Sequence, residues 1–85
     1  MNDILEELHK YSFENEQALS AVKSCGCFYC LKIFSPDEIT YWVNDRNGKT
    51  ALCPYCTIDS VIPESISGEY ELNDELLKVM NDRFF

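Results

Sequence analysis

Two cysteine pairs constrain this chain more than any other feature of its sequence. Cys27 and Cys30 form the first C-x2-C pair, Cys53 and Cys56 form the second, and the segment 31–52 separates them. Two thiolates at this spacing can bind one side of a metal ion, and a tetrahedral ion needs a second such pair. The pattern is typical of a four-cysteine zinc ribbon, in which each pair forms a tight turn, or knuckle, and the intervening strands bring the knuckles together. We therefore expect Cys27, Cys30, Cys53 and Cys56 to hold one Zn²⁺.

The fifth cysteine leaves two interpretations open. Cys25 is either a spare buried thiol or a ligand in place of Cys27, in a wider C-x4-C loop. Four cysteine ligands fill every coordination position of a zinc ion, so no water is left for it to activate. The expected role of the metal is structural, and we expect no enzymatic activity.

The length predicts one domain, residues 1–85, near the size below which a chain needs a metal, disulfides or a partner to hold its fold. The order of helix and strand signals along the chain predicts an α+β fold. Residues 1–23 form a helical segment, 24–62 the ribbon, and 63–85 a loop with a C-terminal helix. Within the first segment, apolar residues recur at helical spacing with a break near Tyr11 and Ser12, and Asn2 or Asp3 can cap the start. This segment is expected to cover the open face of the ribbon.

The ribbon segment carries strand and turn signals in a regular order. Strands are predicted at 31–34, 40–43 and 50–52, with Ser35 opening a short helical turn through a capping box with Glu38. Residues 44–48 supply turn chemistry, with Asn47-Gly48 the strongest hairpin signal. The knuckles are therefore expected at the base of one antiparallel hairpin. Asn73 is a candidate cap for the last helix, whose apolar face comprises Leu72, Leu76, Leu77, Met80 and Phe84.

The charge distribution favours a protein partner. The net charge is −8, yet residues 27–58 carry three acids and three bases, so a neutral ribbon lies between two acidic flanks. Such a surface repels phosphate and attracts basic proteins. We therefore expect a non-catalytic protein-protein interaction module with a basic partner, for example an immunity protein, an antitoxin or an adaptor.

Two other functions are weighed against this one. A weak single-stranded nucleic-acid binder would stack bases on Tyr41 and Trp42 and contact phosphates through Arg46 and Lys49, although the acidic flanks oppose it. A thiol redox protein is the weakest hypothesis. Cys53-Pro54-Tyr55-Cys56 matches the active-site string of glutaredoxins, but the segment 57–85 that follows it is too short to complete that fold.

Two further features of the sequence indicate the cellular compartment of the protein. No stretch approaches the roughly 20 apolar residues that span a bilayer. The acidic N-terminal residues are unlike a secretory signal. We expect a cytoplasmic protein with reduced cysteines and no membrane partner, whereas nothing in the sequence predicts its oligomeric state.

A resemblance is carried by the segments Cys25–Phe34 (CGCFYCLKIF), Glu38-Ile39, Trp42, Ala51–Cys56 (ALCPYC) and Ile58–Ile62 (IDSVI). Through them, the region from Ser24 to Ile62 resembles a family of small bacterial proteins that are labelled only as cytoplasmic proteins. The resemblance implies a compact zinc-ribbon-like protein and no particular activity. Similar sequences tend to carry glycine after the last cysteine, where Thr57 stands here. Because a β-branched residue resists positive φ, we expect a second knuckle that is looser or differently shaped.

Overall fold

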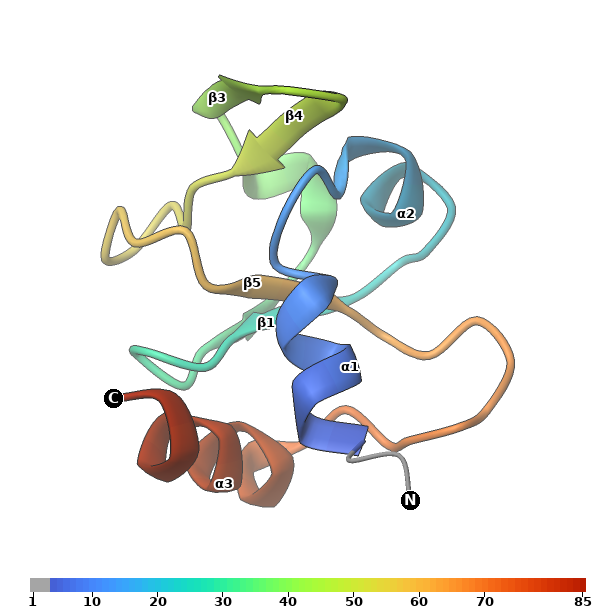
Figure 1. Ribbon diagram of the computed structural model, residues 1–85, viewed down its shortest axis with the longest axis vertical. Coiled ribbons are helices and arrows are strands. Elements are labelled where there is room, and N and C mark those ends of the chain that lie inside the picture. The colour runs from blue at the N-terminus through green and yellow to red at the C-terminus, as the bar shows by residue number, and fades with distance from the viewer. Residues whose placement is uncertain (1–3) are drawn as a thin grey trace.

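The computed structural model describes residues 4–85, so the predicted caps Asn2 and Asp3 lie outside the described residues (Figure 1). The fold is α+β, with helices at both ends of the chain and two antiparallel sheets between them. The elements are α1 (Ile4–Lys10), α2 (Glu16–Ser20), β1 (Cys25–Cys27), β2 (Ile33–Phe34), the 3-10 helix η1 (Pro36–Glu38), β3 (Trp42–Asp45), β4 (Gly48–Ala51), β5 (Val61–Pro63) and α3 (Asp74–Phe84).

A three-stranded sheet of order β2-β1-β5 lies at the centre of the molecule, between α3 at one end and the β3–β4 hairpin with α2 at the other (Figure 1). All three residues of β1 are buried, because both faces of the strand are covered. Successive side chains of a strand point to opposite faces, so the sheet divides the interior into two cores. The cysteine-side core comprises Leu19, Cys25, Cys27, Phe34, Ile39, Ala51, Cys53 and Val61. The helix-side core comprises Leu8, Phe28, Ile62, Leu77 and Met80.

Gly26 of β1 faces Leu77 of α3 and the nearby Leu72. A Cβ atom at this position would lie 3.1 Å from Leu77 Cδ1 and 3.2 Å from Leu72 Cδ1, closer than ordinary van der Waals contact. The missing side chain therefore lets the apolar face of α3 approach β1, which brings the C-terminal helix onto the strand that leads into the first knuckle.

The break predicted in the N-terminal helical segment is confirmed, and a buried asparagine explains where it lies. Asn15 precedes α2 but makes no side-chain cap bond. Its side chain is only 2% exposed. The Nδ2 group donates to Tyr11 O (3.0 Å) and Val61 O (2.9 Å), and Oδ1 accepts from Ala51 N (3.0 Å). One side chain thus joins the N-terminal segment to both β4 and β5.

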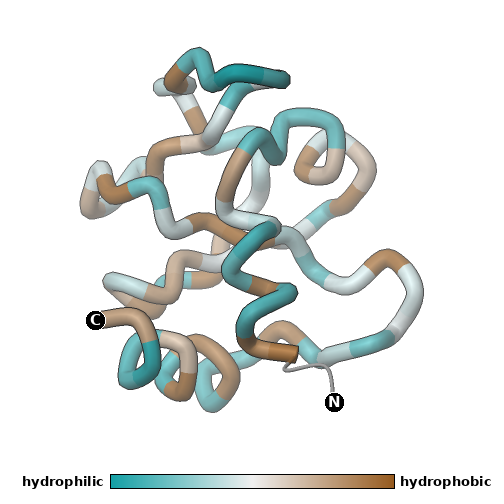
Figure 2. The backbone as a smooth tube through the Cα atoms, viewed as in Figure 1, coloured by the Kyte–Doolittle hydropathy of each residue, from teal (hydrophilic) through white to brown (hydrophobic). Residues whose placement is uncertain are grey.

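The predicted hairpin is present, and its two-residue turn lies within the predicted turn segment 44–48. β3 continues through Asp45, and Arg46 and Asn47 form the turn, so Gly48 already belongs to β4. Two hydrogen bonds from outside the hairpin hold it against the N-terminal segment. Glu14, at φ 50°, donates its N–H to Thr50 Oγ1 (2.8 Å), and its carboxylate accepts from Asn47 N. The tip of the hairpin is hydrophilic (Figure 2).

Both helix starts that carried strong local signals are confirmed. Ser35 accepts from Asp37 N while the Glu38 carboxylate accepts from Ser35 N, which completes the predicted capping box at η1. Asn73 Oδ1 accepts from Leu76 N at 2.9 Å and so caps α3. The predicted apolar face of α3 packs into or against the helix-side core.

Candidate metal centre

The first knuckle connects β1 to β2. Leu31 N donates to Cys27 O (2.8 Å) and Cys27 N donates to Lys32 O (2.9 Å), which closes the turn around the cysteine pair. Tyr29 N points at Cys27 Sγ, 3.4 Å away. The turn that creates the C-x2-C spacing therefore also directs a backbone N–H at one of the two sulfurs.

The second knuckle repeats this pattern. Thr57 N donates to Cys53 O (2.9 Å), Cys53 N donates to Ile58 O (3.0 Å), and Tyr55 N lies 3.4 Å from Cys53 Sγ. The expectation of a looser second knuckle is wrong, because the same two backbone bonds close it at nearly the same lengths as in the first. Thr57 adopts the left-handed conformation (φ 66°) despite its branched side chain, as Leu31 does at the matching position (φ 67°).

The two knuckles are brought together by strand pairing rather than by one hairpin. The first belongs to the central sheet, whereas the second follows the β3–β4 hairpin and leads into β5. β5 then pairs with β1, with Val61 opposite Cys27. The expected arrangement, both knuckles at the base of one hairpin, therefore holds only for the pair Cys53 and Cys56.

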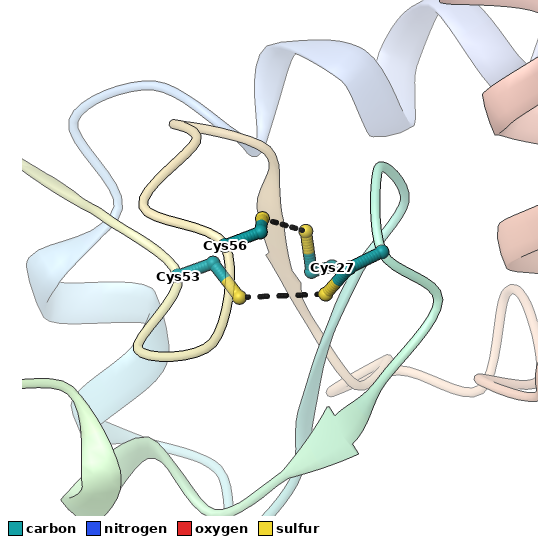
Figure 3. A group of neighbouring side chains, drawn as sticks. Cys27, Cys53 and Cys56 are labelled. Carbon is teal, nitrogen blue, oxygen red and sulfur yellow. Dashed lines mark hydrogen bonds between the residues drawn. The ribbon is translucent and has the colours of Figure 1, made fainter.

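The four predicted cysteines converge on one point. Cys27 Sγ lies 3.6 Å from Cys56 Sγ, and Cys30 Sγ lies 3.6 Å from Cys53 Sγ. All four sulfur atoms lie within 4.8 Å of one another. Figure 3 shows sulfurs from the two knuckles facing each other across the gap between them. Four sulfurs around a tetrahedral Zn²⁺ at about 2.3 Å would be about 3.8 Å apart, so the observed cluster fits such an ion.

The four sulfurs differ in their burial and in how their surroundings shift the thiol pKa. Cys27 and Cys53 are buried, whereas Cys30 and Cys56 are partly exposed. Burial raises the pKa of Cys53 and Cys56 above the ordinary thiol value. For Cys30, burial is outweighed by hydrogen bonds from the Lys32 backbone and the neighbouring cysteines, so its pKa is lowered. A bound cation would favour four thiolates where burial alone favours thiols.

Ser60 is a further residue of this site that sequence reasoning missed. Its hydroxyl is buried and lies 3.0 Å from Cys27 Sγ. A hydroxyl that donates to a sulfur ligand orients it and stabilises its charge. The position could have been recognised only as a polar residue directly before the buried Val61.

Cys25 lies apart from this cluster. It is buried, its sulfur lies 3.4 Å from Phe34 O, and it does not belong to the group of four converging sulfurs. Burial raises the pKa of its thiol to about 12, and the nearby Cys53 contributes. Of the two interpretations left open by the sequence, this geometry corresponds to the spare buried thiol.

The residues considered for nucleic-acid contacts lie in or beside the β3–β4 hairpin and differ in exposure. Tyr41 is 70% exposed, while Trp42 packs against the cysteine-side core. Arg46 and Lys49 are exposed. Arg46 shares a hollow with Glu14 and Asp45, together with Phe13 and Asn47, so acidic side chains lie beside the base expected to meet phosphate.

In residues 4–85, no helix is long and apolar enough to cross a membrane. Comparison with models of known protein families, with curated proteins and with solved structures finds no match for the chain. The resemblance to a family of small bacterial proteins therefore remains a prediction, and function must be argued from the site itself.

Proposed function

We propose that the protein holds one structural Zn²⁺ through Cys27, Cys30, Cys53 and Cys56 and acts, without catalysis, as an acidic module that binds another protein. The observation that carries the metal assignment is the convergence of four sulfurs from two matching knuckles within 4.8 Å. When bound, the ion cross-links the central sheet to the segment that follows the hairpin. Zinc-finger peptides gain roughly 10–16 kcal/mol of apparent free energy from such sites.

The non-catalytic assignment is supported by the number and kind of ligands. Four cysteine sulfurs complete a tetrahedral shell, which leaves no position for water or substrate. A role for His9 as a catalytic base has no support either. Its ring packs among aromatic side chains, stacked on Phe84 with centroids 4.2 Å apart and tilted against Phe28 at 6.0 Å.

The protein-binding assignment is supported by charge and its placement. The net charge is −8, and the two acidic residues at the start of α3, Asp74 and Glu75, are exposed. Complementary charge accelerates association and selects among partners. A basic partner such as a nuclease held by an immunity protein or an antitoxin, or a nucleic-acid enzyme bound by an adaptor, has the surface that this protein would attract.

Single-stranded nucleic acid is the second candidate, favoured by one observation, the exposed ring of Tyr41. Base stacking on an aromatic ring contributes roughly 1–3 kcal/mol per base, but the affinity also requires cations along the strand. Here Glu14 and Asp45 lie beside Arg46 and counter its charge.

Two measurements test the proposal. Native mass spectrometry should find one zinc per chain, and Cys30→Ala should lose it. Binding should then be compared at low ionic strength between a single-stranded oligonucleotide and a basic protein of similar size. The proposal predicts salt-sensitive binding to the protein only. Tight oligonucleotide binding that is lost in Arg46→Glu would refute the protein-binding assignment.

A further inference from the structure

The central sheet has two edges, and side chains close only one of them. At the β5 edge, the outward carbonyl of Val61 accepts from Asn15 Nδ2 (2.9 Å), and that of Pro63 accepts from the Tyr70 hydroxyl (2.6 Å). Pro63 also has no N–H to offer. At the opposite edge, β2 is the last strand, and no other strand within residues 4–85 pairs with its outer side.

The register shows which backbone groups face outward on β2. In an antiparallel pair, every second residue exchanges backbone hydrogen bonds with the residue opposite. Phe28 N donates to Ser60 O, so Gly26, two positions earlier, also directs its backbone N–H and C=O toward β5. Gly26 is also the partner of Ile33 on β2. Because the backbone groups of Gly26 point toward β5, Ile33 directs its own N–H and C=O away from β1, toward the free edge.

A groove runs along this edge, with Ile33 at its centre. The Ile33 side chain is 44% exposed and lines two adjoining hollows, which also share Glu71 and Leu72. We call these hollows together the β2 edge groove. Its carboxylates are Glu64, Glu71, Asp74 and Glu75, and no Lys or Arg of residues 4–85 lines either hollow.

We propose that the β2 edge groove binds an extended, basic segment of a partner protein, which adds to the sheet as a strand beside β2. This inference rests on the proposed protein-binding function and assigns it a site. Ile33 exchanges two backbone hydrogen bonds with the partner residue opposite. That residue projects on the same face as Ile33. A lysine or arginine there lays its aliphatic stem over Ile33 and places its charge near Glu71 and Glu75.

The side chains on the two faces of β2 determine which positions of the partner segment are basic. Lys32 precedes Ile33 and so lies on the other face, where its ammonium sits over the Tyr55 ring, 5.0 Å from the centroid. Partner residues on that face are therefore uncharged, and bases occupy alternate positions. A second copy of this chain is a poor occupant, because pairing two β2 edges would bring the two sets of carboxylates together.

A synthetic peptide tests the groove directly. The probe is acetyl-Lys-Thr-Lys-Thr-Lys-Thr-Lys-amide, titrated into the zinc-loaded full chain at low ionic strength and followed by amide chemical shifts in NMR. The control peptide carries N-methyl groups on the lysine backbone nitrogens, which keeps the charge but removes the strand hydrogen bonds. We expect the largest shift change at the Ile33 amide with the probe, and a response at least ten-fold weaker with the control.

Variants separate the edge from the general charge of the surface. Glu71→Gln with Glu75→Gln should weaken binding about five-fold, whereas Glu16→Gln with Asp59→Asn, the same charge change elsewhere, should leave it within two-fold. Ile33→Pro removes the outward N–H, which β1 does not use, and should weaken binding about ten-fold. Zinc retention, measured by native mass spectrometry, verifies that each variant is folded. If Ile33→Pro does not fold, the double variant Glu71→Gln with Glu75→Gln still tests the groove.

The possible outcomes are distinct. If all variants bind the probe equally, the edge assignment is overturned while the acidic-module proposal survives. If wild-type protein binds basic proteins but not the probe, the edge assignment also fails alone. A dimer that Ile33→Pro abolishes would assign the edge to a second copy and overturn the proposed partner. If the protein binds neither basic proteins nor the probe, both the edge assignment and the proposed protein-binding function fail.

Discussion

Replacing Asn15 tests how the N-terminal segment is attached to the rest of the fold. The side chain makes three hydrogen bonds, of which those to Val61 O and Ala51 N involve residues that are fully buried. Asn15→Ala leaves both buried backbone groups without their partner, at a cost of roughly 1–3 kcal/mol each. With the weaker loss at Tyr11 O, we expect the free energy of unfolding to fall by about 3–5 kcal/mol.

Urea unfolding of the zinc-loaded protein measures this effect. For a small domain, the expected loss lowers the midpoint by about 2 M or more at unchanged slope. Asn44→Ala, an exposed asparagine on β3, is the matched control and should change stability by less than about 0.5 kcal/mol. A loss below about 1 kcal/mol in Asn15→Ala would refute the claim that this side chain holds the N-terminal segment against β4 and β5.

Three further substitutions test separate parts of the fold. Gly26→Ala should destabilise the protein by about 1–3 kcal/mol, because the new Cβ crowds Leu77, and Leu77→Val should relieve part of this cost in a double-mutant cycle measured by urea unfolding. Thr57→Gly should stabilise the protein by about 0.5–1 kcal/mol in thermal unfolding, since φ 66° is strained for a β-branched residue; destabilisation would show that the knuckle is not strained there. Cys25→Ala should keep one zinc per chain in native mass spectra, whereas loss of the metal would make Cys25 a ligand.

Local signals in the sequence predicted those features whose causes are local. The capping box of Ser35 and Glu38 and the Asn73 cap were recognisable because each side chain and its backbone partner lie within one helical turn of each other. The convergence of two cysteine pairs was also predictable. Two knuckles at this spacing serve one ion only if the chain brings them together.

Features that depend on long-range contacts were not predictable in the same way. The hairpin is held by hydrogen bonds to Glu14, which lies in the N-terminal segment, far from the hairpin in sequence. Pro63 was expected in a loop, yet it ends β5, because its missing N–H falls on the outer edge of the sheet. The roles of Asn15 and Ser60 are likewise fixed by strands that the sequence could not place beside them.

The central claim is that one ion joins the two knuckles, and metal content measured together with folding tests it most directly. Native mass spectrometry should show one zinc per chain, and removing it with a chelator should abolish the dispersed amide spectrum of the folded protein. Less than one equivalent of metal, with an unchanged spectrum after chelation, would contradict the account. The four sulfurs would then be packed thiols, and the fold would depend on its two cores alone.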